Sequence, residues 1–555
     1  MNSGSSINDL IQGVFGPVVD VLETVVFFAV PIFGADVPVL VIWLFAGSVF
    51  LTCWLRVRPI RDAVQTFRVV RGHLSRHRDP GEVTSFQAVA TELSGTVGLG
   101  NIAGVAVAVS IGGPGATLWI IIAGVLGMAV KMAEATLAQM FRRVHSDGKV
   151  SGGPMYYLRD GLASVGRPKL GKTMAFIYAF CLMIAVMGAG NLFQSNQMTA
   201  HLIDATGGDE GPLAGYSWAV GVVLAVIAGL VILGGIKTIA KMTSRLVPVM
   251  TVLYGGSVII ILAVNFNQLP EAVRLIVHGG LTGESIQGGM LGVAVIGIQR
   301  ALFSNVAGVG TAGMAHAVTK NRRPAEEGFV AAWEPFLDSV VVCTMTALAI
   351  IVTGSYGGSD VDGINLTTQA FASVHSAFPY LLTVCIALFA FSTILSYSYY
   401  GKKAAGYVFG QSRVAERIYD VVYLVMIVVG ASVTLDTVVR FSDAMFFLVT
   451  VPNLLGIYLL GKVLRREIQG YRHDAACGRI PLVPEEERST MLGRPMSDKI
   501  AEAGLVSGRR SGPGTSAGAE SAEGRTRNDT ALLDPGSEGE ADGARQTGPI
   551  RRGED

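Results

Sequence analysis

Two of the long hydrophobic segments of this chain are interrupted by glycine close to their middles. One runs Glu92-Leu-Ser-Gly-Thr-Val-Gly-Leu-Gly-Asn-Ile-Ala-Gly104 and the other Leu302-Phe-Ser-Asn-Val-Ala-Gly-Val-Gly-Thr-Ala-Gly313. A helix in lipid must satisfy its own backbone hydrogen bonds, so unwound backbone is tolerated there only where it lines a cavity. Two interruptions at matching places in two halves of a chain indicate a binding site at mid-membrane depth.

The composition is that of a membrane protein that crosses the bilayer many times. Of the 555 residues, 50% are hydrophobic and only 15% are charged, whereas soluble domains carry about 25% charged residues. The five cysteines are scattered, without a CxxC pair or a Cys/His cluster, so no metal site is indicated. We predict an all-α membrane protein with about 11 transmembrane helices. They lie at roughly 38–55, 84–110, 115–140, 173–203, 216–236, 246–266, 288–317, 328–353, 377–402, 415–435 and 440–464.

Basic residues alternate along the chain and predict its orientation. Lys and Arg cluster after the first, third, fifth, seventh, ninth and eleventh of these helices, whereas the stretches 204–215 and 354–376 contain neither. Cytoplasmic loops carry the excess of Lys and Arg in membrane proteins. We therefore expect a multi-pass protein of the cell membrane, with its N-terminus outside and its C-terminus in the cytoplasm.

The helix count divides the chain into two inverted halves. Residues 1–83 form an N-terminal segment with one extra helix and a basic cytoplasmic linker, residues 84–266 a first five-helix repeat and residues 288–466 a second. Because five is odd, the second repeat enters from the opposite face, and each repeat begins with an interrupted helix. Residues 470–555 are rich in Gly, Ser, Ala, Glu and Arg, so we predict a disordered cytoplasmic tail there.

The residues of the two interruptions suit a zwitterion together with a small cation. Their glycines allow backbone groups to turn toward a ligand at little steric cost. Broken helix ends expose N–H groups that attract a carboxylate and carbonyl groups that attract a cation. A single glycine more often serves helix packing, but glycine clustered with Asn and Thr exceeds what packing requires. The glycines concerned are Gly95, Gly98, Gly100, Gly308 and Gly310.

Further motifs carry a family resemblance. They are Gly95-Thr-Val-Gly-Leu-Gly-Asn-Ile-Ala-Gly104, Gly112-Gly-Pro-Gly115, Lys131-Met-Ala-Glu134, Gly152-Gly-Pro-Met-Tyr-Tyr157, Gly188-Ala-Gly-Asn191, Leu302-Phe-Ser-Asn305, Ser392-Thr-Ile-Leu395, Ser398-Tyr-Tyr-Gly401 and Pro452-Asn453. With them the chain, from Arg58 to Arg466, resembles the alanine/glycine:cation symporter family. Val97-Gly-Leu-Gly-Asn101 is also similar to the broken first core helix of neurotransmitter:sodium symporters, and that resemblance implies their inverted five-plus-five repeat.

The resemblance implies a set of binding residues. Backbone groups near Gly98 would hold a substrate carboxylate, and those near Gly308 would hold its ammonium group. The sodium ligands would be oxygen atoms, which suit a hard cation. The implied substrate-binding residues are Thr96, Gly98, Gly100, Gln194, Asn196, Asn305, Gly308, Thr393 and Tyr397. The implied sodium site is formed by Ser94, Val97, Asn101, Ser392 and Thr393.

Three positions depart from the family pattern. Val306 and Lys402 stand where the family usually has glutamate, and Tyr397 stands where it usually has tryptophan. Val306 removes a carboxylate beside the second interruption. Tyr397 shortens an aromatic wall and adds a hydroxyl group. We therefore expect a pocket that accepts a somewhat larger or more polar side chain than the methyl group of alanine.

Ionisable residues within the predicted helices are further candidates for function. Glu92 precedes the first interruption and fits either ion coupling or a gate. Glu134 lies one turn from Lys131, with which it can pair. Asp338 has no opposite charge close in sequence. His316, near the end of a predicted helix, is expected to be structural or interfacial.

These features predict a secondary active symporter that imports small neutral amino acids such as alanine and glycine, coupled to sodium by alternating access. Proton coupling stays open as an alternative, as does the oligomeric state. An ion channel would need a continuous polar pore. A membrane-embedded enzyme would need an HExxH, GxSxG or paired-aspartate motif, which the sequence lacks. We expect no catalytic residue and no cofactor besides the coupling ion. The expected partners are the amino-acid substrate and the lipid bilayer, and we expect no binding of nucleic acid.

Overall fold

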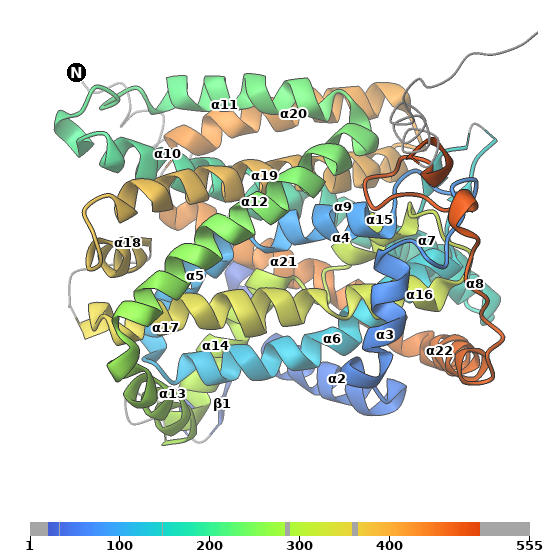
Figure 1. Cartoon of the computed structure of the whole chain (residues 1–555), viewed down its shortest axis with the longest axis horizontal. Helices are drawn as coiled ribbons and strands as arrows, with labels where there is room; N and C mark the ends of the chain where they lie inside the picture. Colours follow the sequence, from blue (N-terminus) through green and yellow to red (C-terminus); the bar gives the residue numbers. More distant parts are fainter. Residues whose placement is uncertain are drawn as a thin grey trace, which may run out of the picture. The chain divides into compact units, whose positions relative to one another are not determined.

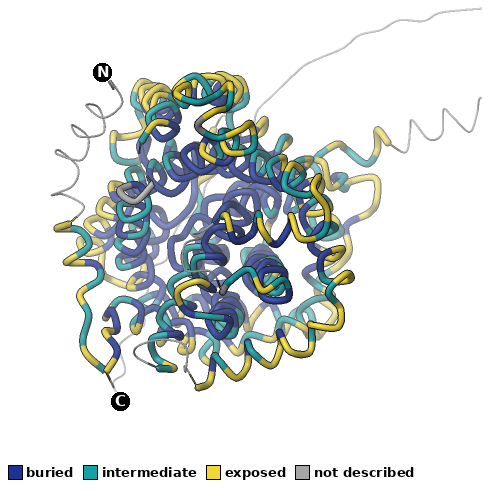
Figure 2. The backbone as a smooth tube through the Cα atoms, turned by 90° about the vertical axis from the view of Figure 1, so that its left-hand side faces the viewer, coloured by how far each residue is buried: buried dark blue, intermediate teal, exposed yellow. Residues whose placement is uncertain are grey.

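The fold is that of a computed structural model of the chain. The structure describes residues 20–499 except 33, 147, 283–288, 358–363 and 434. The first 19 residues and the predicted tail from residue 500 onward lie outside the described residues. Helices dominate the described part (Figure 1), and the helices at its centre are the most deeply buried (Figure 2).

Two short hairpins depart from the expected all-α fold. β1 (Ala29–Ile32) pairs antiparallel with β2 (Ala35–Pro38), and β3 (Arg143–Val144) pairs antiparallel with β4 (Val150–Ser151). Strands of two to four residues are too short to leave an alternating hydrophobic pattern, which is the signal that sequence reading depends on. The fold class is otherwise confirmed as helical.

Each of the eleven segments that we predicted to cross the membrane is helical. The first is α2 (Val39–Leu55), followed by α3 (Pro59–Val70). The predicted first repeat contains α4 (Ser85–Thr96), η1 (Leu99–Asn101), α5 (Ala103–Gly112), α6 (Ala116–Met140), α9 (Pro168–Met187), η3 (Gly188–Leu192), α10 (Phe193–Ala205), α11 (Ser217–Ile232) and α12 (Gly235–Val264). The predicted second repeat contains α14 (Gly289–Asn305), α15 (Thr311–Ala317), α16 (Pro324–Ala331), η6 (Phe336–Cys343), α17 (Thr344–Val352), α19 (Phe378–Val408), α20 (Arg413–Ser432) and α21 (Leu435–Leu459).

Shorter elements connect or extend these helices. They are α7 (Pro154–Tyr156), η2 (Tyr157–Gly161), α8 (Leu162–Ser164), η4 (Gly208–Glu210), η5 (Phe266–Gln268), α13 (Leu269–Thr282), η7 (Ser355–Gly357), α18 (Ile364–Ala372), α22 (Gly461–Ala476) and η8 (Glu485–Glu487). Within the described residues, six helices are long and apolar enough to cross a membrane, or up to eight spans if each sharply bent pair is one span. The count of eleven spans, the inverted repeat and the orientation stay predictions.

The first interruption separates α4 from α5. A capping box starts α4, because Thr84 Oγ1 accepts from the Gln87 amide at 3.2 Å and Gln87 Oε1 accepts from the Thr84 amide at 3.0 Å. The helix ends at Thr96, and Gly98 adopts an extended backbone. The chain resumes as η1 and α5 after a bend of 55°.

The second interruption separates α14 from α15 by five residues, 306–310. Gly308 (φ +99°) and Gly310 (φ +93°) adopt left-handed backbone, which glycine accepts without strain. Val306 does so too (φ +46°), although a β-branched residue is rare in that region. Both predicted interruptions are therefore real breaks in helical structure.

The helices around the two breaks pack together. α4 contacts α15, α16, α12 and α19, and α6 contacts α14, α15 and α16. Figure 1 shows α4 beside α15 near the middle of the molecule. α19 also packs on α9, α10 and α12, so one long helix borders the first break.

Helical and hydrogen-bonded structure continues past the predicted tail boundary at residue 470. α22 continues to Ala476, and residues 483–492, here called the strap, contact the start of α4 and the segment before it. Thr84 Oγ1 donates to the Met491 carbonyl at 2.6 Å, and Gln87 Nε2 donates to the Leu492 carbonyl at 3.3 Å. The boundary was placed too early because these contacts use backbone carbonyls, which a polar composition does not reveal.

Candidate functional site

The first break meets α19 through a group of oxygen atoms. The carbonyl oxygen of Ser94 accepts from Thr393 Oγ1 at 2.9 Å and from Ser392 Oγ at 3.4 Å. The hydroxyl of Ser94 bonds to that of Ser396. All four residues are buried. Three of the five expected sodium ligands therefore lie together.

Gly98 lies next to this group. A Cβ at Gly98 would be 2.7 Å from Thr393 Oγ1 and 3.7 Å from Gln194 Oε1, so only glycine fits. Gln194 donates from Nε2 to the Ala189 carbonyl at 3.0 Å. Its buried Oε1 accepts no hydrogen bond from the described residues. A buried acceptor facing a glycine backbone is suited to a polar ligand, because burial without a partner is costly.

Tyr397 forms an aromatic wall beside the same break. Its ring stacks on Phe446 with centroids 5.9 Å apart. Gly95 and Gly190 flank the ring, since a Cβ at Gly95 would lie 3.1 Å from it and one at Gly190 only 2.3 Å away. Gly190 belongs to the π-helical segment η3, an irregularity that is frequent at functional sites.

Asn101 is engaged in holding the break together. Its Oδ1 accepts from the Gly98 amide at 3.0 Å, and its Nδ2 donates to Asp338 Oδ1 at 2.7 Å. Asp338 Oδ2 accepts from Ser304 Oγ at 2.7 Å and from Ser339 Oγ at 2.9 Å. The carboxylate that had no opposite charge close in sequence therefore joins the first break to α14, after which the second break begins.

Three further expected site residues lie beside the first break but have no described contact with the group around Ser94 and Thr393. Thr96 Oγ1 donates to its own helix, at the Glu92 carbonyl. A Cβ at Gly100 would lie 3.5 Å from Phe303, so Gly100 sits against α14. Val97 ends α4. These residues border the pocket without a described contact to Gln194 or Thr393.

Two asparagines of the expected substrate set bond to neighbouring helices. Asn305 donates to Ser339 Oγ at 2.9 Å and accepts from the Ala307 amide at 3.0 Å. Asn196 donates to the carbonyls of Gly430 and Val433, at the end of α20. Their side chains are directed to helix ends rather than to Gly98.

Gly308 is held by residues that were not expected to do so. Its amide donates to Glu134 Oε1 at 2.9 Å, and its carbonyl accepts from Asn453 Nδ2 at 2.8 Å. A Cβ at Gly308 would face Leu44, Thr450 and Leu454 at 3.6 Å. The structure therefore does not bring Gly308 together with Gly98 and Thr393.

One expectation about a charge pair, that of Lys131 with Glu134, needs correction. Lys131 forms its ion pair with Glu92 and lies 3.7 Å from Glu334, whereas Glu134 binds the Gly308 amide. The helical spacing of Lys131 and Glu134 permitted a pair, but the second break offers Glu134 the amide of Gly308. Lys402, where the family usually has glutamate, is paired with Asp420.

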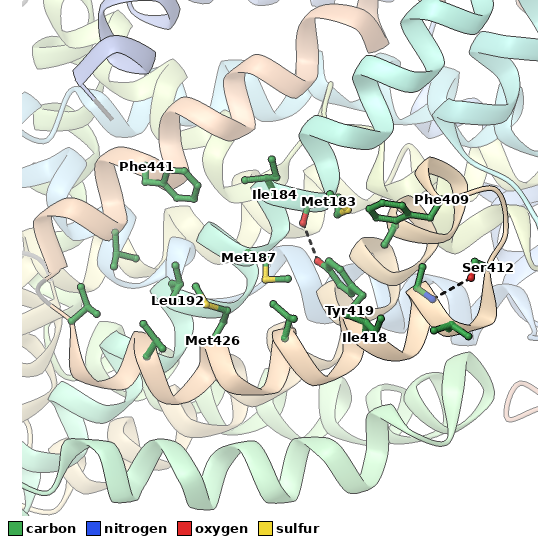
Figure 3. Close-up of a pocket in the computed structure, with 17 residues that line it drawn as sticks. Met183, Ile184, Met187, Leu192, Phe409, Ser412, Ile418, Tyr419, Met426 and Phe441 are labelled. Atoms are coloured by element: carbon green, nitrogen blue, oxygen red, sulfur yellow. Dashed lines mark hydrogen bonds between the residues drawn. The ribbon is translucent and has the colours of Figure 1, made fainter. Parts of the chain in front are cut away.

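An apolar groove lies outside this polar region. Its volume is about 980 Å³, and Met187, Met426 and Phe441 are among its lining residues (Figure 3). A hydrogen bond from Tyr419 to the Met183 carbonyl, 3.0 Å long, crosses its wall. Such a lining cannot pair with the carboxylate and ammonium groups of an amino acid, so the groove is not the substrate site.

Comparison with known proteins identifies the family. Residues 20–483 match the family model of sodium:alanine symporters. The chain belongs to the sodium:alanine symporter family. The sodium/alanine symporter AgcS of Methanococcus maripaludis is 35% identical over 441 residues, which cover 78% of this chain and 94% of that protein. The probable sodium/glutamine symporter GlnT of Bacillus subtilis is 31% identical over 446 residues, covering 80% and 90% respectively. The expected family resemblance is thereby confirmed.

The fold of this family member is also found among solved structures. The crystal structure of MhsT in complex with L-phenylalanine matches with a TM-score of 0.51 at 15% identity, covering 72% of this chain and 98% of that one. At this identity the likeness shows a shared fold, in agreement with the expected neurotransmitter:sodium symporter-like fold. A symporter family is a family of transporters, which agrees with the expectation of a transport protein.

Several residues of the symporter's site had no expected role. Ser396 follows Ser392 by one helical turn, a spacing that places both hydroxyls on one face of α19. Asn453 belongs to the Pro452-Asn453 motif that contributes to the family resemblance, yet no sequence signal linked it to Gly308. Ser339 lies beside Asp338 and joins it to Asn305. The sequence signal that could have found these three residues is their place as small polar residues within apolar helices.

Proposed function

We propose that this family member is a secondary active symporter that imports small neutral amino acids with sodium by alternating access. It works as a multi-pass protein of the cell membrane, with its N-terminus outside and its C-terminus in the cytoplasm. The observation that carries the proposal is the meeting of the Ser94 carbonyl with the hydroxyls of Ser392 and Thr393 at a broken helix. Sodium, rather than a proton, suits this set because all its members are neutral oxygen atoms.

The sodium site consists of Ser94, Val97, Ser392 and Thr393, with Asn101 as a supporting residue. The two α19 hydroxyls donate to the Ser94 carbonyl, at 3.4 and 2.9 Å. On binding, they turn their lone pairs to the ion together with that carbonyl. Asn101 supports the site by bonding the Gly98 amide and Asp338, which keeps the broken backbone in place.

The substrate pocket lies at Gly98, Gln194, Thr393 and Tyr397. The unpaired Gln194 Oε1 can accept from an ammonium group, and the first backbone amides of η1, directly after Gly98, can donate to a carboxylate. Thr96 and Gly100 form the adjoining backbone. Asn196, Asn305 and Gly308 act around the pocket, by holding the helices that enclose it.

The substrate range is broader than alanine and glycine. Tyr397 is a narrower wall than the tryptophan usual in the family, and it carries a hydroxyl group. The relatives of this chain include proteins named for alanine and for glutamine. We expect serine, threonine or glutamine to compete with labelled alanine for uptake. Competition by alanine and glycine alone would contradict this range.

A matched pair of α19 variants tests the site. Thr393→Ala removes a hydroxyl from the Ser94 group, whereas Ser398→Ala removes one that donates to its own helix, at the Leu395 carbonyl. We expect sodium-dependent alanine binding by purified Thr393→Ala protein to weaken about tenfold or more. Ser398→Ala should bind like the unmodified protein. Equal affinities in the two variants would remove Thr393 from the site.

A further inference from the structure

Five ionisable side chains form one unbroken series of contacts inside the protein. Glu92 of α4 pairs with Lys131 of α6, and Lys131 Nζ lies 3.7 Å from Glu334 Oε2, between α16 and η6. Beyond Glu334 come His316 of α15 and Glu327 of α16. Each side chain is at most 1% exposed. The substrate pocket and sodium site described above use none of the five.

His316 lies between two carboxylates. Its Nδ1 is 2.6 Å from Glu327 Oε2, and its Nε2 is 2.7 Å from Glu334 Oε1. A neutral imidazole has one N–H donor and one lone pair, and an ionised carboxylate can only accept. With a neutral ring, one of these short contacts would therefore set a lone pair against a carboxylate oxygen. With both ring nitrogens protonated, both contacts are hydrogen bonds.

An imidazolium at His316 also balances the charges of the series. The signs then alternate from Glu92 through Lys131, Glu334 and His316 to Glu327. Buried charges are tolerated when each is paired and hydrogen-bonded. Neutral donors also bond to the carboxylates at the two ends of the series. Glu92 accepts from Thr311 (2.7 Å) and Tyr400 (2.5 Å). Glu327 accepts from Ser85 (2.5 Å) and Asn321 (3.2 Å).

Other polar and charged groups nearby are engaged away from the ring. Gln139 of α6 donates to the His316 carbonyl, and Arg142, just after α6, donates to the carbonyls of Ala317, Thr319 and Asn321. Glu134 accepts from the Gly308 amide, and Glu326 accepts from Tyr471 at 3.3 Å. Among the described residues, Glu327 and Glu334 alone form hydrogen bonds to the imidazole ring.

We propose that His316 is a proton-binding site, an imidazolium held between Glu327 and Glu334, whose proton must stay bound for transport. α15 carries His316 and begins at Thr311, directly after the second break. Loss of the proton leaves a lone pair against one carboxylate, which loosens α15 from α16 and from the Glu92 end of the series. The claim that transport requires this proton rests on the function proposed above, whereas the claim that His316 binds a proton does not.

Nitrogen-15 NMR of histidine-labelled protein tests proton binding directly. The chain has eight histidines, and the signals absent from a His316→Gln variant belong to His316. At neutral pH we expect both of its ring nitrogens to be protonated. In Glu334→Gln the new amide can donate to Nε2, so the ring should become neutral with one N–H. A neutral His316 ring in the unmodified protein at neutral pH would overturn the proposal.

Uptake into liposomes tests the link to transport, with the same pH on both sides and a fixed sodium gradient. Uptake should fall about tenfold for each pH unit above the midpoint at which NMR shows His316 losing its proton. Because the ring is expected to be neutral in Glu334→Gln, this variant should already have low uptake at neutral pH and show no further fall at higher pH. His201→Gln is the matched control, because this buried histidine bonds to Thr383 and to no described carboxylate, and it should keep the original profile.

The two proposals fail in different ways. Unmodified protein that takes up no alanine at any pH contradicts the proposed function, while NMR still decides whether His316 binds a proton. Sodium-driven uptake whose pH profile does not follow the His316 titration, or is the same in Glu334→Gln, overturns the link between this proton and transport. Melting curves of each variant establish that it is folded.

Discussion

Replacing Gly190 with alanine should displace the ring that walls the proposed substrate pocket. A Cβ at Gly190 would lie 2.3 Å from Cγ and Cδ1 of Tyr397, so the ring must move by about 1 Å to reach an ordinary contact. Phe446, stacked on Tyr397 with centroids 5.9 Å apart, restricts that movement. Overpacking of this kind costs about 1–3 kcal/mol. If the cost falls on binding, alanine affinity drops about 5- to 150-fold.

The assay is sodium-dependent binding of labelled alanine, together with thermal melting of the purified protein. Gly104→Ala is the matched control, because a Cβ at Gly104 has nothing within 4 Å. It lies in α5, where alanine is favoured over glycine by about 0.5–1 kcal/mol. Gly190→Ala protein that binds and melts like Gly104→Ala would refute this reasoning.

Three further predictions concern other parts of the molecule. Asp338→Asn should lower the free energy of unfolding by about 1–3 kcal/mol, because the carboxylate accepts hydrogen bonds from both break regions; an unchanged melting curve would contradict this. Ending the chain after Gly478 removes the strap's hydrogen bonds and should lower the free energy of unfolding by about 2–4 kcal/mol. Ending it after Lys499 keeps the strap and should leave stability unchanged, so equal melting temperatures would contradict a stabilising role of the strap. Burial, together with Arg488 for His73 and Lys320 for His77, lowers the pKa of these histidines. Their contribution to stability is therefore complete above the ordinary value of 6.5 and is lost as pH falls through the lowered pKa, so hydrogen exchange of the strap should rise on acidification.

The helices and the two breaks could be predicted because each leaves a local signal. Apolar length marks the helices, and glycine clustered with Asn and Thr marks the breaks. Partners across the fold leave no such signal. Gly308 occupied a position equivalent to the first break, which suggested a ligand site, but Glu134 and Asn453 bind it from 174 and 145 residues away. A separation of 39 residues likewise concealed the pairing of Lys131 with Glu92.

The set at Ser94, Ser392 and Thr393 was expected from a resemblance, and physical reasoning on sequence alone would not have found it. Ser94 and Thr393 are 299 residues apart, and the contact uses a backbone carbonyl that every residue possesses. Gln194 likewise needs the π-helical turn before it to face Gly98. Such a turn depends on packing against Tyr397 rather than on any residue preference.

The central claim is that sodium drives amino-acid uptake through this chain. Alanine uptake should be measured in liposomes at one fixed pH, with and without an inward sodium gradient, for the unmodified protein and Thr393→Ala. We predict accumulation that requires the gradient and is strongly reduced in Thr393→Ala. Accumulation that is the same with no gradient of any ion would contradict the account.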